Sequence, residues 1–364
     1  MRIVVESRIE TPKFMVYLVP VVSVVLALVF GGILMAVVGA DPIATYKAMA
    51  EGAFGSVEQW RAGQYYSITE TLVKAIPLML TSLAVGVAFR MLFWNIGAEG
   101  QLVLGGVSAS AVALWLGDLI PGVPESQWIY LPLMAGAGII AGGVWAVVPA
   151  ILKAYLKVNE IITTLMLNYV AILWYQYLVN VAWKDPDGYG FPGSAKFGEC
   201  CKIARISGRL HWGLGVAFVC AILMWIILDK TKWGYQIRLI GENVEAARYG
   251  GINIGRNIVG VMMLSGGLAG LAGMVEVSGI SHSLQEGLNM GYGFTAIIVS
   301  WLARLNPWGI VIVANMFAAI LVGGDQIQMT MGLPGSVGHV LQGTMLFCVL
   351  GGEFFQRYRL AIKT

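Results

Sequence analysis

Long uninterrupted runs of apolar residues constrain this chain more than any other feature of its sequence. Residues 14–40 form 27 consecutive uncharged residues, and further apolar runs recur along the chain. A helix needs about 20 apolar residues to cross the hydrocarbon of a bilayer, whereas the strands of a membrane barrel would alternate apolar and polar residues. We therefore expect an all-α polytopic membrane protein.

The composition agrees with this fold class. Hydrophobic residues make up 58% of the 364 residues, charged residues 12%, and the mean hydropathy is +0.76. About a quarter of the residues of a soluble domain are charged, so an ordinary soluble fold is excluded. The formal net charge of +3 is too small to suggest nucleic-acid binding.

About ten membrane spans are expected, and nine or eleven are alternatives because the C-terminal spans are short and interrupted by glycine. The first run is longer than the apolar part of a cleaved signal peptide, so we expect it to be a retained helix. All spans are expected to form one transmembrane domain over residues 1–364. They cover residues 14–40, 71–93, 95–116, 128–152, 158–181, 211–228, 257–279, 291–302, 307–322 and 337–350.

The distribution of Lys and Arg predicts the orientation of these spans. When the N terminus is placed in the cytoplasm, cytoplasmic segments contain 15 of the 23 Lys and Arg residues, and the short outer turns contain none. Short loops carry most of the weight in the positive-inside rule. We expect both termini and the connection 229–256 in the cytoplasm, and the loops 41–70 and 182–210 on the periplasmic side.

Residues 238–256, RLIGENVEAARYGGINIGR, are too polar for lipid although they lie between two apolar runs. Residues 243–249 can form two helical turns in which Ala246 and Ala247 are adjacent. Gly250 and Gly251 then end the helix, because glycine tolerates a left-handed cap. We expect a short helix with a small-residue face that docks another protein on the cytoplasmic side.

Pairs of glycines four residues apart occur in two expected spans. These pairs are Gly138 with Gly142 and Gly266 with Gly270. Small residues at this spacing let helix backbones approach closely. We interpret both pairs as packing sites and not as catalytic features.

No catalytic arrangement is visible in the sequence. It lacks a GxxxxGK[ST] phosphate loop, an HExxH motif and a GxSxG motif. One GxGxxG string, at Gly188, Gly190 and Gly193, lies in an outer loop with a proline inside it, so we expect no nucleotide site there. The histidines and cysteines show no metal-ligand spacing and no disulfide framework. We expect no enzyme and no bound cofactor, so energy must come from a partner or an ion gradient.

Polar residues at membrane depth are candidates for a solute pathway, because a buried carboxylate or amide is costly unless it is paired or faces water. Glu160, Thr164 and Asn168 are four residues apart and share one helix face. Alternatively, these groups are structural ties that hydrogen-bond to neighbouring helices, and both interpretations stay open. The other candidates are Asn95, Glu99, Gln101, Glu276 and Tyr292.

Four strings of a specific kind occur in order along the chain. They are FWNIGAEGQ at 93–101, NEIITTLMLNY at 159–169, the GEN, Ala-Ala and Gly-Ile positions within 241–252, and GYGFT at 291–295. Together they resemble the permease subunits of ABC importers for nucleosides and simple sugars. The resemblance covers about residues 71–351 and is closest to the longer permease of guanosine-type uptake systems. Trp94 stands where the family more often has a smaller residue, and residues 182–210 have no match.

The resemblance implies a type II ABC importer-like permease in the bacterial inner membrane. Its partners would be a second, similar permease in a heterodimer, cytoplasmic ATPases that use ATP and Mg²⁺, and an extracytoplasmic substrate-binding protein. The docking helix would be the coupling helix that seats in the ATPase. Its positions here are Gly241, Glu242, Asn243, Ala246, Ala247, Gly251 and Ile252.

The expected function is passage of a small neutral polar solute, a nucleoside, by alternating access that partner ATPases drive. A simple-sugar permease is an alternative. A secondary transporter with Glu99 or Glu276 as its coupling acid is a rival of another class, and it predicts transport without an ATPase. A membrane enzyme acting on lipid would need a nucleophile, acid or metal constellation that the sequence lacks.

Overall fold

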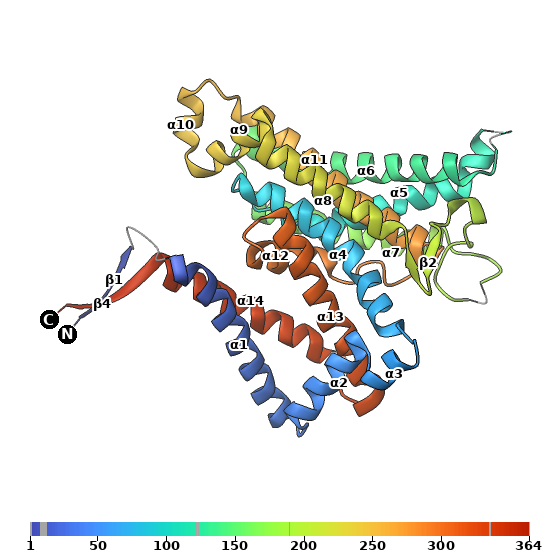
Figure 1. Ribbon diagram of the computed structural model, residues 1–364. Coiled ribbons are helices and arrows are strands. Elements are labelled where there is room, and N and C mark those ends of the chain that lie inside the picture. Colours follow the sequence, from blue (N-terminus) through green and yellow to red (C-terminus); the bar gives the residue numbers. More distant parts are fainter. Residues whose placement is uncertain are drawn as a thin grey trace. The chain divides into compact units, whose positions relative to one another are not determined.

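The structure, a computed structural model, describes residues 2–7, 13–120, 122, 124–188, 190–334 and 336–363 (Figure 1). Long apolar runs form most of its helices, as the sequence predicts. The α-helices are α1 (Lys13–Val37), α2 (Pro42–Phe54), α3 (Val57–Arg61), α4 (Tyr66–Arg90), α5 (Ala98–Leu119), α6 (Gln127–Leu156), α7 (Glu160–Tyr177), α8 (Gly213–Lys230), α9 (Lys232–Glu242), α10 (Val244–Tyr249), α11 (Ile254–Glu276), α12 (Tyr292–Leu302), α13 (Pro307–Met331) and α14 (Ser336–Arg357).

Within the described ranges, extended structure forms only short segments. β1 (Arg2–Ser7) pairs antiparallel with β4 (Tyr358–Lys363), with Arg2 opposite Lys363. β2 (Arg205–Ser207) pairs antiparallel with β3 (Leu210–His211). A 3₁₀ turn covers Glu199–Cys201, and π-helical turns at Leu178–Ala182 and Val277–Ser281 extend α7 and α11.

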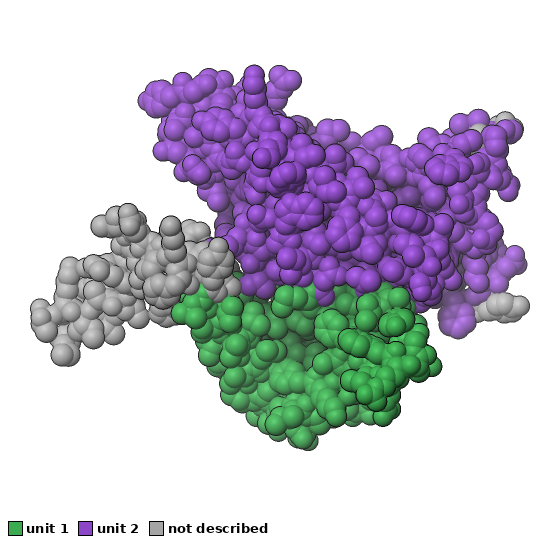
Figure 2. Space-filling model, in the orientation of Figure 1, with its two compact units in different colours: residues 1–71, 316–364 green, residues 72–315 purple. Residues whose placement is uncertain are grey.

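Backbone contacts divide the chain into two compact units (Figure 2). Unit 1 comprises residues 1–71 and 316–364, and unit 2 comprises residues 72–315. In unit 1, a small core joins Met35 of α1, Met49 of α2, Ile327 of α13 and Leu341 of α14. The helices α4 and α13 each contribute to both units, and the expectation of one transmembrane domain stays a prediction.

Unit 2 is built on a close contact of three helices, α5, α6 and α11. A Cβ atom on Gly142 of α6 would overlap the backbone oxygen of Gly266 of α11. In the same way, a Cβ on Gly270 would overlap the oxygen of Gly138, and one on Gly273 would overlap the oxygen of Leu102 in α5. The helices therefore touch backbone to backbone, which confirms the packing role predicted for both glycine pairs.

The predicted all-α polytopic class is confirmed. Within the described part of the chain, seven helices are long and apolar enough to cross a membrane, and eight if α1 with the bent segment after it counts as one span. Two shorter apolar helices cover Tyr292–Leu302 and Ser336–Val349. The expected number of ten spans is reached only if the bent pair and both shorter helices are included.

The expectation of a loop over residues 41–70 is wrong in its secondary structure. Asp41 caps α2 by accepting from the N–H of Ile43, and Pro42 occupies the first turn. Ser56 and Gln59 form a capping box at the start of α3. The apolar segment 21–37 and the helical segment 42–61 meet at 116°. The chain therefore turns sharply across the short break between α1 and α2, and helical structure resumes at Pro42.

The eighth expected span is too short to cross a bilayer. α12 has 11 residues, which corresponds to about 16 Å of helix, whereas the hydrocarbon layer is about 30 Å thick. Its first residues are buried, and the N terminus of α12 therefore ends inside unit 2. By contrast, α14 continues to Arg357, beyond the expected end at residue 350.

The glycine contact predicts a position-specific effect within one helix. Gly142→Ala should lower stability by about 1–3 kcal/mol, because the new methyl group would meet the backbone of α11. Gly136→Ala is the matched control, since a Cβ there meets nothing within 4 Å. The control should be neutral or slightly stabilising. Thermal unfolding in detergent measures both variants, and equal melting temperatures would contradict the close contact.

Candidate functional site

The polar connection between α8 and α11 folds into α9 and α10. Asn243 begins α10 by accepting a hydrogen bond from the N–H of Ala246 at 3.0 Å. Gly251 has a φ of +74°, and the next residue, Ile252, donates its N–H to the oxygen of Ala247 at 3.1 Å. The helix predicted over residues 243–249 and its glycine stop are confirmed.

The residues of α10 divide between an inner and an outer face. Ala247 is fully buried, while Ala246 is exposed and Tyr249 is 92% exposed. Gly241 packs against the end of α4, and among the other residues predicted to couple, Glu242, Asn243 and Gly251 are exposed and Ile252 is half-buried. A partner would therefore meet Val244, Ala246 and Tyr249, whereas Ala247 seats the helix on its own protein. Contact of these residues with an ATPase stays a prediction.

The segment α9–α10 lies at the opposite end of α8 from the hairpin of β2 and β3 (Figure 1). The 18 residues of α8 separate the two by about 27 Å. Its 18 residues lie within the range of about 17–25 residues found for membrane-spanning helices. This arrangement agrees with the prediction that the connection 229–256 and the insertion 182–210 face opposite sides of the membrane.

In the turn between α4 and α5, Asn95 and Gly97 are buried and Ile96 is half-buried, and side chains of α7 hydrogen-bond to the backbone there. Asn168 donates to the oxygen of Ile96 at 2.6 Å and accepts from the N–H of Gly100 at 2.7 Å. Thr164 accepts from the N–H of Ile96 at 3.3 Å. The two residues thus replace the partners that this non-helical backbone lacks, as a structural tie does.

Asn95 and Gln101 form a second polar cluster with α11. The side-chain amides of Asn95 and Gln101 hydrogen-bond to each other in both directions at 3.1 Å. Asn95 also donates to the hydroxyl of Ser265 at 3.0 Å, and Ser265 donates to the oxygen of Ala84 in α4 at 2.6 Å. All four residues are buried, and their hydrogen bonds join α4, α5 and α11.

Glu99 binds the buried N terminus of α12. One carboxylate oxygen accepts from the N–H of Gly291 at 2.8 Å, and the other accepts from the N–H of Gly293 at 2.5 Å. These N–H groups have no partner within the helix, and a carboxylate is favourable at the positive end of the helix dipole. Tyr292, another candidate, is buried between these two glycines.

The remaining two candidates differ in their surroundings. Glu160 forms an ion pair of 2.6 Å with Lys153, across the turn between α6 and α7. Glu276 is 3% exposed, and its Oε2 atom has no hydrogen-bond partner among the described residues. Lys74 and Arg209 place positive charge in its surroundings. Of the predicted pathway acids, Glu276 is therefore the one that the described structure leaves with an unsatisfied buried oxygen.

Several residues that join helices through hydrogen bonds or ion pairs are not among the site residues predicted from the sequence. Ser265 is one small residue in a glycine-rich helix, and nothing in its sequence distinguishes it. Arg90 and Asp229 end their helices as ordinary flanking charges, yet they form an ion pair of 3.0 Å. Whether two charged residues at the ends of different helices form an ion pair depends on how the helices pack. A single sequence carries no signal for this packing.

The outer insertion packs against the segment that follows α11. Gly193 of the GxGxxG string makes an isolated bridge with Gln285, and the N–H of Ser194 donates to the oxygen of Leu284 at 2.8 Å. Among the residues that the structure describes, no strand leads directly into the string and no helix directly follows it. The two neighbouring thiols, Cys200 and Cys201, are 3.6 Å apart and free. Burial raises the pKa of Cys201 to about 12, so its thiol stays protonated.

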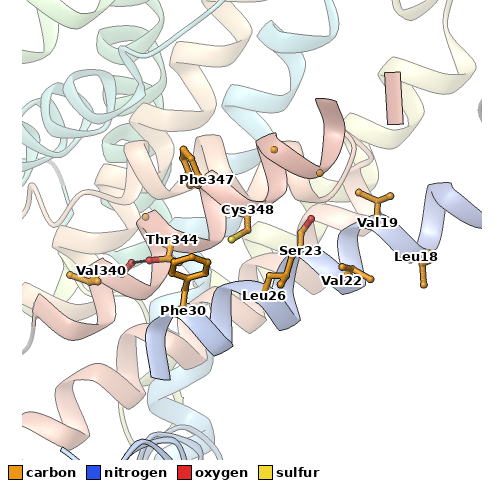
Figure 3. A pocket seen from close by; sticks show the side chains of 13 residues that line it. Leu18, Val19, Val22, Ser23, Leu26, Phe30, Val340, Thr344, Phe347 and Cys348 are labelled. Atoms are coloured by element: carbon orange, nitrogen blue, oxygen red, sulfur yellow. Dashed lines mark hydrogen bonds between the residues drawn. The ribbon is translucent and has the colours of Figure 1, made fainter. Parts of the chain in front are cut away.

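A groove of about 780 Å³ runs between α1 and α14 in unit 1 (Figure 3). Its lining is almost entirely apolar and includes Leu26, Phe30 and Phe347. Ser23 and Thr344 add hydroxyl groups, but the Thr344 hydroxyl already donates to the oxygen of Val340. Such a lining matches hydrocarbon, and it offers a polar solute few hydrogen bonds.

Comparison with known proteins identifies relatives over nearly the whole chain. It is 32% identical to the glucose ABC transporter permease protein TsgB13 of Haloferax volcanii, over 98% of this chain and 93% of that protein. It is also 32% identical to the guanosine ABC transporter permease protein NupP of Bacillus subtilis, over 91% and 92% of the two chains. The nucleoside ABC transporter permease protein NupB of Lactococcus lactis is 28% identical over 91% and 90%.

The family described as the permease component of branched-chain amino acid transport systems matches residues 67–350. This range contains every helix from α5 to α13, the segment α9–α10 and all of the polar clusters described above. Together with the membrane-length helices, the match makes the chain a multi-pass protein of the cytoplasmic membrane. The chain belongs to this family of transport permeases.

Proposed function

We propose that this chain is the permease subunit of an ATP-binding-cassette importer and that it carries a nucleoside. The observation that carries the proposal is α10, a short helix capped at both ends, with exposed residues at one end of the membrane helices. A capped helix that presents Val244, Ala246 and Tyr249 is a rigid docking element. Relatives named as ABC transporter permeases support a cytoplasmic ATPase as its partner.

The hydrogen bonds of Glu99 argue against this residue as the coupling acid of an ion-gradient mechanism. Glu99, one of the two acids that an ion-gradient mechanism would use, has both carboxylate oxygens bound by backbone N–H groups. A proton on either oxygen would disrupt one of these bonds. Glu276 remains as an acid for such a mechanism. The commitment of Glu99 to the end of α12 favours ATP-driven alternating access, in which two permeases rock around a shared path.

The solute is proposed to be neutral, with hydroxyl groups that donate to Glu276. A buried carboxylate oxygen without a partner is unfavourable, and the hydroxyls of a ribose or a hexose would satisfy it. Relatives named for guanosine and for nucleosides favour a nucleoside. A sugar is the second candidate, because the relative named for glucose is equally similar in sequence. A substrate-binding protein outside the membrane would deliver either solute.

The proposal predicts that transport requires ATP. The chain should be reconstituted in liposomes with its second permease, its ATPase and its binding protein, and uptake of labelled guanosine and of labelled glucose should be compared. Guanosine uptake and guanosine-stimulated ATP hydrolysis are expected, and both should stop with a non-hydrolysable ATP analogue. Uptake that continues without ATP would overturn the importer proposal, while uptake of glucose alone would replace the nucleoside by a sugar.

The exposed side of α10 should be required for ATPase association. Ala246→Glu adds a charged side chain on the outer face, so it should leave the fold intact but abolish co-purification of the ATPase. Ala62→Glu is the control at an exposed position outside α10. The binding of the ATPase is measured by affinity purification from detergent. Normal association of the Ala246 variant would remove this surface from the interface.

Replacing each of the two buried acids by glutamine should change a different property of the protein. Glu99→Gln should lower stability by about 1–3 kcal/mol, because one backbone N–H of α12 loses its acceptor. Glu276→Gln should preserve stability but raise the KM for guanosine by about tenfold, since hydrogen bonds to charged groups contribute ~1.5–3 kcal/mol. Thermal unfolding and initial uptake rates measure the two effects. An unchanged KM would exclude Glu276 from the solute path.

A further inference from the structure

The base of the segment α9–α10 is held by one carboxylate between two guanidinium groups. Asp229, at the end of α8, accepts from Arg90 of α4 at 3.0 Å and from Arg238 of α9 at 3.3 Å. Both arginines donate to the same oxygen, Oδ1. Asp229 is thus the shared acceptor through which the side chains from α4 and α9 are linked.

Each arginine also binds a backbone carbonyl beyond Asp229. Arg90 donates through Nε to the oxygen of Leu305, in the turn after α12, at 3.0 Å. Arg238 donates to the oxygen of Leu228, in the last turn of α8, at 2.5 Å. A continuous chain of hydrogen bonds therefore runs from the turn after α12, through the end of α4 and Asp229, to α9.

A second contact joins the same two helices without any side chain. A Cβ on Gly241, at the end of α9, would overlap the backbone oxygen of Arg90, at the end of α4. The two backbones are therefore in direct contact a few residues from the ion pairs. Because α9 touches the end of α4 both through Gly241 and through Asp229, a displacement of α9 is resisted at two points.

The side chains of these two ion pairs are partly shielded from solvent. The side chains of Arg90, Asp229 and Arg238 are 14%, 31% and 39% exposed. Solvent and salt screen such partly buried pairs less than fully exposed ones. Loss of the carboxylate charge would leave two cations facing each other, and both would be held in place by their other hydrogen bonds.

We propose that Asp229 is the positioning residue that transmits movement of α9–α10 to α4 and to the turn after α12. The inference rests on the proposed function, because it assumes that an ATPase moves α10. In this role Asp229 acts through Arg90 and Arg238, and not by direct contact with the solute or the ATPase. A residue that only stabilises the fold would change the melting temperature without changing how much solute is moved for each ATP hydrolysed.

The test uses the reconstituted complex and compares uptake of labelled guanosine with ATP hydrolysis. Asp229→Asn should retain ATPase association but lower guanosine uptake per ATP by about fivefold or more, the lower range of coupling between sites. Asp229→Glu keeps the charge and should stay within about twofold of the unmodified protein. Glu51→Gln is the control, since it removes one partner of an exposed ion pair with Lys47.

A distance measurement tests the same inference without relying on transport rates. Spin labels at Leu92, just after α4, and Tyr235, in α9, occupy positions that are 56% and 58% exposed. The four native cysteines are replaced by alanine for this purpose. In the otherwise unmodified complex, the distance between the labels should be the same without nucleotide and with trapped ATP. Asp229→Asn should broaden its distribution.

The outcomes separate this inference from the proposed function. A label distance that changes with ATP in the unmodified complex would overturn the inference, as would equal uptake per ATP in Asp229→Asn. Loss of ATPase association in that variant would also overturn it, because Asp229 would then act in docking. If the unmodified chain binds no ATPase at all, the proposed function fails and the inference falls with it.

Discussion

Backbone hydrogen bonding is the constraint on which the rest of unit 2 depends. Inside a membrane protein, a chain that leaves a helix has no water to satisfy its N–H and C=O groups, so the protein itself must supply partners. The half-buried backbone of Ile96, in the turn between α4 and α5, meets this requirement with Thr164 and Asn168 of α7. Asn95 of the same turn reaches Ser265 of α11. The polar residues thereby fix the relative positions of four helices.

The sequence predicts some of these features and not others. Apolar runs predict the membrane helices well, because the hydrocarbon layer imposes a minimum length, and glycine spacing correctly predicts where helices touch. The same reasoning missed α2 and α3, although Asp41-Pro42 and Ser56 with Gln59 are helix-start signals that were available. The polar face of α7 was identified, but its partners were not. Whether the amide of Asn168 contacts a solute or a buried backbone depends on a segment that is adjacent in space but about 70 residues away in sequence.

Unit 2 combines a rigid interior with a projecting segment at one end. Backbone contact between α5, α6 and α11 leaves no room for side-chain rearrangement, so these helices are suited to move as one body. The segment α9–α10 has few buried residues and a large exposed surface, as an element that meets a partner requires. Asp229 lies where the two parts join, and its contacts there are ionic and directional.

The position of Glu99 has a consequence for the charge of the solute that the protein can carry. The N terminus of a helix is a ready-made binding site for anions, because its free N–H groups and its dipole both favour negative charge. In α12 that end is buried, and the carboxylate of Glu99 already occupies it. A phosphate group would have to displace a carboxylate held by two hydrogen bonds. The protein's own anion therefore makes this end of α12 unattractive to a phosphorylated solute, and a nucleoside differs from its nucleotide in that group alone.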